Sequence, residues 1–97
     1  MAFGIVIEMP GVTAETYDAV NEKLDLENDL PNGLILHTAG LGPNGVWRIF
    51  DVWESGEAFA RFEEGRLRSA LDEVVGDNRP SGPLGDPIYQ LHNIIKA

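Results

Sequence analysis

The sequence predicts an α+β fold in which one four-stranded antiparallel sheet carries two helices on one face. Four short apolar runs have the composition of β-strands, and two longer stretches repeat apolar residues at helical spacing. The six elements follow one another in the order β-α-β-β-α-β, which defines the ferredoxin-like, split βαβ unit. A chain of 97 residues is of a size for one domain, which we expect to span residues 1–97.

The first strand and the first helix follow from hydrophobic spacing. Residues 3–8 (FGIVIE) form an almost continuous apolar run, which is typical of a strand covered on both faces. Thr13 is a good N-cap for a helix that extends to about residue 26, and acidic residues follow it in the first turn. The apolar stripe of this helix comprises Tyr17, Val20 and Leu24.

Two strands joined by a tight turn come next, at residues 34–38 and 46–53. The connection at 40–45 (GLGPNG) matches the G-x-G-x-x-G spacing of dinucleotide-binding loops. Such a loop must lead into a helix, whose N-terminus meets the pyrophosphate, whereas a strand follows here. We therefore interpret residues 40–45 as a β-hairpin connection.

The last third of the chain is expected to hold a helix, a loop and a strand. Ser55 is an N-cap for a helix with a long apolar stripe to about Val75, and Gly76 is its natural end. Residues 76–87 contain three glycines and three prolines, which predicts a mobile loop that could act as a lid. The fourth strand is expected at 88–95.

Composition excludes several classes of function. The chain has no cysteine, so disulfides, thiol nucleophiles and cysteine-based metal sites are ruled out. Its net charge is −9, which repels phosphate backbones and anionic lipid, so we expect no nucleic-acid and no membrane partner. Residues 1–11 do not have the basic-then-apolar pattern of a secretion signal, and we expect a cytoplasmic protein.

Both faces of the predicted sheet are apolar. In the third strand Ile49 and the two tryptophans alternate with Phe50 and Val52, so neither face has the composition of a water-exposed surface. A small domain gains burial by associating with a second copy, which predicts a homodimer with the second face covered.

The two histidines, His37 and His92, both fall within predicted strands and are the candidate catalytic bases. Their ordinary pKa of about 6.5 suits proton abstraction at neutral pH. For either histidine taken alone, the residue pattern favours the alternative, a structural imidazole satisfied by hydrogen bonds. No local His-His spacing indicates a metal site, which would need a carboxylate such as Asp51, and we predict no metal.

Asp51 is the third candidate for a catalytic role, because it lies in a strand that otherwise looks buried. Buried carboxylates must be paired or neutral, and they cluster at functional sites. A structural ion pair, for example with Arg61, is the alternative. Trp47 and Trp53 share the face of Asp51 and would form either core or an aromatic pocket wall.

The segment 51–59 (DVWESGEAF) resembles the dimeric α/β-barrel superfamily, in particular the antibiotic biosynthesis monooxygenase (ABM)-like domains. That resemblance implies a homodimer whose two sheets form a barrel, with a pocket in each subunit between its sheet and its helices. Members of this superfamily include cofactor-independent monooxygenases of aromatic polyketides and haem-degrading enzymes.

Trp53 matches the tryptophan that opens the second helix in the haem-degrading branch, but residues 55–75 contain no histidine to bind iron. We therefore expect no cofactor. Pockets of the polyketide branch use Trp, Arg, Tyr, His and Asn side chains. Trp53 is the substrate-binding candidate that the motif match supplies, and the candidates on chemistry alone are Trp47, Tyr17, Arg48 and Asn93.

Two hypotheses about function remain open. In the first, the protein is a cofactor-independent monooxygenase or a related small enzyme, such as an isomerase or cyclase, acting on an aromatic molecule; His37 or His92 removes a proton and Arg48 balances an anion. In the second, it is a non-catalytic dimeric binding or structural domain. An aromatic-lined pocket that reaches a histidine would favour the first, and a filled interior the second.

Overall fold

The computed structural model describes residues 2–76 and 88–95. Its elements are β1 (Phe3–Met9), α1 (Ala14–Leu24), β2 (Leu34–Leu41), β3 (Trp47–Trp53), α2 (Gly56–Phe62), a π-helical turn (Glu63–Leu67), α3 (Arg68–Val74) and β4 (Ile88–Gln90). The strands form one antiparallel sheet in the order β2-β3-β1-β4. This is the predicted ferredoxin-like α+β fold. The loop and lid predicted at 76–87 lie, beyond Gly76, outside the described residues.

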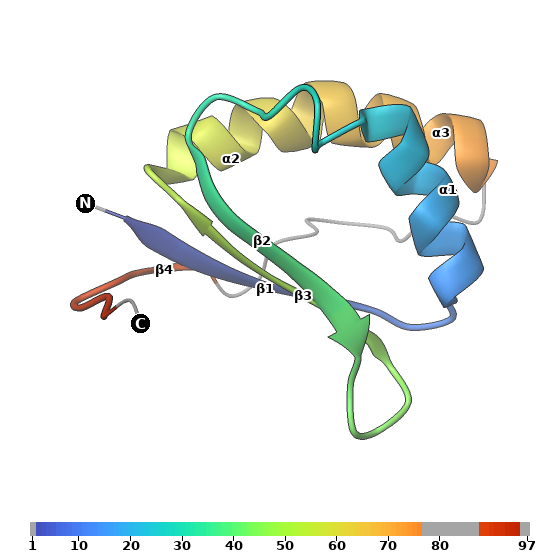
Figure 1. Ribbon diagram of the computed structural model, residues 1–97, viewed down its shortest axis with the longest axis horizontal. Helices are drawn as coiled ribbons and strands as arrows, with labels where there is room; N and C mark the ends of the chain where they lie inside the picture. The colour runs from blue at the N-terminus through green and yellow to red at the C-terminus, as the bar shows by residue number, and fades with distance from the viewer. Residues whose placement is uncertain (1, 77–87, 96–97) are drawn as a thin grey trace.

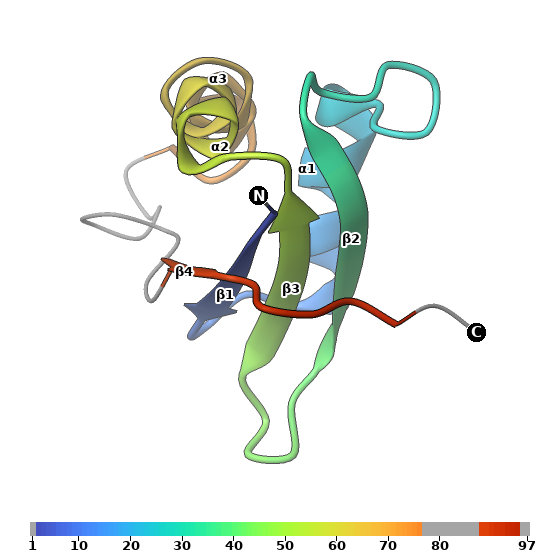
Figure 2. The same cartoon turned by 90° about the vertical axis from the view of Figure 1, so that its left-hand side faces the viewer.

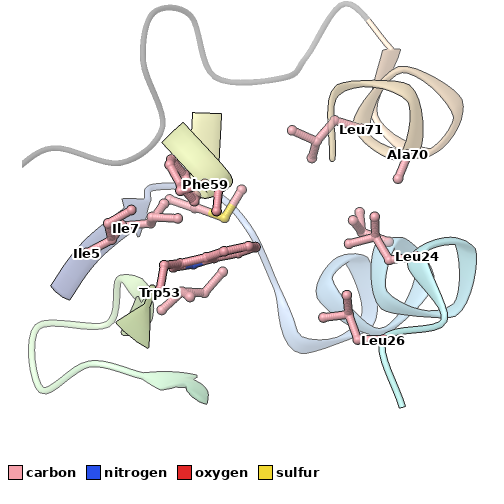
Figure 3. Close-up of a cluster of buried hydrophobic side chains, with 12 residues drawn as sticks. Ile5, Ile7, Leu24, Leu26, Trp53, Phe59, Ala70 and Leu71 are labelled. Atoms are coloured by element: carbon pink, nitrogen blue, oxygen red, sulfur yellow. The ribbon is translucent and has the colours of Figure 1, made fainter. Parts of the chain in front are cut away.

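The helices cover one face of the sheet, and the core lies between the two layers (Figure 1). Figure 3 shows Trp53 extending from the end of β3 beneath Phe59, with Leu24 on α1 and Leu71 on α3 across from it. The Trp53 side chain is among the most deeply buried in the described chain. Its ring makes an edge contact with the ring of Phe59, with 5.6 Å between centroids.

Both predicted N-caps are confirmed. The Thr13 hydroxyl accepts a hydrogen bond from the backbone N–H of Thr16, and the Ser55 hydroxyl accepts one from Ala58. α1 ends at Leu24, two residues earlier than expected, because Asp25 takes a left-handed conformation (φ 52°). The second predicted helix is helical throughout Gly56–Val74, with a π-helical turn in its middle that the periodicity did not indicate.

The strand β2 is longer than expected and contains an irregularity. Its register with β3 shifts between Leu34 and Leu36, as a β-bulge does. Simple alternation predicts His37 on the same face as Ile35 and opposite Leu34. Because of the bulge, Leu34 and His37 instead line the same cavity, while Ile35 is 44 % exposed.

The hairpin prediction for residues 40–45 is confirmed, and a second tight connection precedes β2. The backbone N–H of Gly42 donates to the carbonyl of Val46, and Gly45 has a positive φ of 80°. Gly33 also has a positive φ, of 90°, and a Cβ there would stand 2.6 Å from the Cβ of Ala58. Gly33 is therefore required by both its conformation and its close contact with α2.

The fourth strand is shorter than predicted: only Ile88–Gln90 pair with β1. The chain then crosses the sheet on the face away from α1 (Figure 2). There the side chains of Tyr89 and Leu91 lie against Gly4. The second face of the sheet is thus partly covered by the chain's own C-terminal residues.

Candidate functional site

A cavity of about 820 Å³ lies between the sheet and the helices. This volume is within the range of small-molecule sites in proteins. Its walls are mainly aliphatic and aromatic, with contributions from β1, β3, α1 and the long second helix. Six polar or ionisable side chains interrupt this apolar lining: Glu8, Thr16, Tyr17, Asn21, His37 and Asp51.

Three of these side chains form a continuous hydrogen-bonded chain. The Asp51 Oδ1 atom lies 2.7 Å from His37 Nδ1, and the Tyr17 hydroxyl lies 2.6 Å from His37 Nε2. A carboxylate only accepts hydrogen bonds, so Nδ1 carries the hydrogen and Nε2 accepts from the phenol. This arrangement fixes the tautomer and the orientation of the imidazole.

Asp51 is held by two donors. Its side chain is 5 % exposed, its Oδ1 accepts from His37, and its Oδ2 accepts from the indole N–H of Trp53 at 3.2 Å. The carboxylate is therefore paired with the histidine, whereas the alternative partner Arg61 is exposed on α2. Two hydrogen bonds compensate part of the cost of burying this charge.

Tyr17 joins the sheet to α1. Its ring lies 5.2 Å from the ring of Trp47, centroid to centroid, and is nearly parallel to the imidazole of His37. Burial raises the pKa of the Tyr17 phenol above its ordinary value of 10.0, and the nearby Asp51 and Asp18 carboxylates raise it further. The phenol is therefore kept in its neutral, proton-donating form.

Near these hydrogen bonds, two buried polar atoms have no hydrogen-bond partner among the residues that the structure describes: Asn21 Oδ1 and Trp47 Nε1. Asn21 lies one helical turn after Tyr17 on α1 and lines the cavity. An unpaired buried amide oxygen costs about 1–3 kcal/mol. Asn21 therefore places a buried, unpaired amide oxygen close to the Tyr17–His37–Asp51 hydrogen bonds, without exposing that oxygen to the cavity.

The structure brings together four of the residues singled out from the sequence. Tyr17, His37, Asp51 and Trp53 line the cavity, and Trp47 packs behind Tyr17. The remaining three candidates are exposed and are not among the described residues that line it: Arg48, His92 and Asn93. Sequence reasoning missed Asn21, although its i+4 spacing from Tyr17 places both on one helix face.

The cavity does not suit haem iron. Among the described residues, His37 is the histidine that lines it, and both of its ring nitrogens are engaged by Asp51 and Tyr17. No group of three His, Asp or Glu side chains in the described parts of the chain is placed to hold a metal ion. Within the same residues, no helix has the length and apolar character needed to cross a membrane.

This structure is similar to solved structures of other proteins. The sequence matches no protein family and no curated protein. A protein from Chloroflexus aurantiacus named after antibiotic biosynthesis monooxygenases superposes with a TM-score of 0.61 at 15 % identity, over 100 % of this chain and 97 % of that one. The chain has the antibiotic biosynthesis monooxygenase fold.

Two further ABM-fold structures are similar to this one. SnoaB from Streptomyces nogalater, a cofactor-independent oxygenase, has a TM-score of 0.58 at 13 % identity, covering 99 % of this chain and 96 % of its own. A variant of MhuD from Mycobacterium tuberculosis, with two manganese protoporphyrin IX molecules per active site, has a TM-score of 0.55 at 12 % identity and full coverage of both chains. These likenesses show the fold that the sequence predicted.

Proposed function

We propose that this ABM-fold protein is a small cofactor-independent enzyme, of monooxygenase type, that removes a proton from an aromatic, polyketide-like molecule. The observation that carries this proposal is the His37–Asp51 pair, with 2.7 Å between Nδ1 and Oδ1, at the wall of an apolar cavity. A histidine oriented by a buried carboxylate is the usual arrangement of a general base. The imidazolium formed by protonation is stabilised by Asp51.

The proposed reaction requires no cofactor if the substrate itself forms a carbanion. An anthrone has a CH₂ group flanked by two aromatic rings, and its carbanion is delocalised onto the ketone oxygen. Removing one proton gives a carbanion that can transfer electrons to O₂. Overall, the CH₂ group and O₂ give a C=O group and one water, so atoms and electrons balance.

The fold supports this assignment as an analogy. SnoaB, which shares the fold, is a cofactor-independent oxygenase, and similarity of fold alone leaves function to be argued from the site. In this chain the aromatic side chains Trp53, Phe59 and Phe62 line the cavity. Of these, Phe62 is partly exposed and offers a flat apolar face to a polycyclic substrate, whereas Trp53 and Phe59 are almost fully buried.

Oxygen uptake with anthrone as the probe tests the proposal, with histidine variants as the decisive comparison. We expect His37→Gln to lower the rate by about 100-fold or more, which is the usual contribution of a general base. His92→Gln is the matched control, because His92 is exposed on the segment after β4, and its rate should equal that of the unmodified protein. Equal rates in both variants would contradict the proposal.

The alternative is a non-catalytic protein that binds a small molecule in the same cavity. The cavity of about 820 Å³, with its mainly apolar lining, favours binding of a small apolar molecule. Under this alternative, anthrone would raise the melting temperature by binding the native state, without any oxygen uptake. Uptake above the uncatalysed rate, lost in His37→Gln, excludes it.

We also propose that the protein is a homodimer formed through the face of the sheet opposite the helices. Phe50 lies on that face in β3 and is partly exposed, and Ile35 and Leu36 in the edge strand β2 are 44 % and 47 % exposed. Covering such side chains with a second copy removes apolar surface from water. A cytoplasmic location stays a prediction of the sequence.

A further inference from the structure

We propose that Tyr17 is the residue that takes the proton from the substrate, and that His37 receives a proton only through the Tyr17 hydroxyl. This inference rests on the proposed function and adds a second catalytic residue to it. It follows from the two hydrogen bonds that the His37 imidazole makes, one to Asp51 and one to Tyr17.

The imidazole has no free lone pair to offer a substrate. Its Nδ1–H donates to Asp51 at 2.7 Å, and its Nε2 accepts from the Tyr17 hydroxyl at 2.6 Å. A neutral imidazole has one donor and one acceptor nitrogen, so both are used. A substrate can reach Nε2 directly only by displacing the phenol. By contrast, the phenol oxygen accepts no hydrogen bond from the described residues and so keeps a lone pair, and Tyr17 itself lines the cavity.

The transfer proposed here is a two-proton relay. The substrate C–H proton moves to the Tyr17 oxygen while the phenol's own proton moves to Nε2 of His37. The products are a substrate carbanion, a neutral Tyr17 and an imidazolium beside the Asp51 carboxylate, so charge is conserved. The new O–H of Tyr17 then points back at the substrate and can donate to its anion.

The surroundings of Tyr17 favour a relay over a lasting phenolate. Burial and the Asp51 carboxylate raise the pKa of the phenol, so the negative charge does not remain on Tyr17. The ring is held in place between two contacts, the Trp47 ring on one side and the His37 hydrogen bond at its tip. Its position on α1, one turn after the Thr13 cap, fixes the distance to β2.

Proton removal can be measured without the later reaction with O₂. In D₂O without oxygen, NMR monitors the exchange of the anthrone CH₂ hydrogens for deuterium. We expect Tyr17→Phe to slow exchange by about 100-fold, as His37→Gln does. The double variant should be no slower than either single one, because the two residues act as a unit. Tyr89→Phe is the control, since Tyr89 is exposed on β4 and should exchange at the unmodified rate.

The outcomes separate the two proposals. Undiminished or faster exchange in Tyr17→Phe, with exchange lost in His37→Gln, overturns the relay and leaves the proposed function standing. If the unmodified protein causes no exchange, the proposed function fails and the relay with it.

If Tyr17→Phe does not fold, 3,5-difluorotyrosine at position 17 keeps the shape and makes the phenol more acidic. A relay needs a protonated phenol, so the alkaline loss of exchange must then move to lower pH. An unmoved profile overturns the relay.

Discussion

The hydrogen-bonded chain at the cavity is built from side chains that are far apart in the sequence. Tyr17 is 20 residues from His37, and His37 is 14 residues from Asp51. The pairing of β2 with β3 sets His37 directly opposite Asp51, and α1 brings Tyr17 above them. The Tyr17 phenol donates to Nε2 of His37, and Nδ1–H of His37 donates to the Asp51 carboxylate.

The raised pKa of Tyr17 predicts a pH dependence of stability. A group whose pKa is higher in the folded state stabilises the fold below its unfolded pKa, near 10, and this contribution is lost as pH rises through the folded pKa. Near pH 8, Tyr17→Phe should be less stable by about 1 kcal/mol, because it loses one hydrogen bond. Above pH 10 the gap should close, because the Tyr17 phenol ionises more readily in the unfolded chain than in the fold, and Tyr17→Phe has no such phenol.

Urea unfolding at a series of pH values measures this difference, and Tyr89→Phe is again the control. Tyr89 is exposed, so its removal should leave the pH dependence unchanged. A gap between the unmodified protein and Tyr17→Phe that is constant from pH 8 to pH 11 would contradict the prediction.

At the scale of elements, Arg66 joins the long second helix to the end of α1. It lies in the π-helical turn, and its guanidinium donates to the carbonyls of Leu24 and Asp29 at 2.7 and 2.8 Å. The Leu24 carbonyl is at the C-terminus of α1, where a cation is favourable. The turn thus ties together the two helices that close the cavity.

Replacing Arg66 should therefore loosen this contact. We expect Arg66→Met to lower the free energy of unfolding by about 1–2 kcal/mol. This loss is small for hydrogen bonds from a charged group, because the Arg66 side chain is partly exposed to solvent. Arg68→Met, at an exposed position two residues further along, should change it by less than about 0.5 kcal/mol. If chemical denaturation gave the same free energy of unfolding for Arg66→Met and Arg68→Met, the hydrogen bonds of Arg66 would contribute nothing to stability.

The second face of the sheet is only partly covered by the chain itself. The residues after β4 cross this face (Figure 2), yet Leu36 on β2 remains 47 % exposed. The segment after β4 is itself exposed, with Ile95 at 86 %. An exposed apolar edge strand is a liability that association with another copy removes.

Sedimentation velocity tests the predicted dimer. We expect the unmodified protein to sediment as a dimer, and Leu36→Glu to sediment mainly as a monomer, because a carboxylate would be buried in the interface without a partner. Leu30→Glu is the matched control: Leu30 is 66 % exposed, in the connection between α1 and β2 near the helices, and should leave the dimer intact. A monomeric unmodified protein at every concentration would refute the dimer.

The order of elements, the two N-caps, the hairpin at residues 40–45 and the side of β3 that carries Asp51 could be predicted from the sequence, because these depend on local spacing and capping. The tertiary structure decided which candidates meet. A bulge in β2 set Leu34 and His37 on one wall, and the pairing of β2 with β3 chose Asp51 as the partner of His37. Exposure of His92 followed from the early end of β4. Register and bulges depend on contacts between distant segments, which local patterns do not encode.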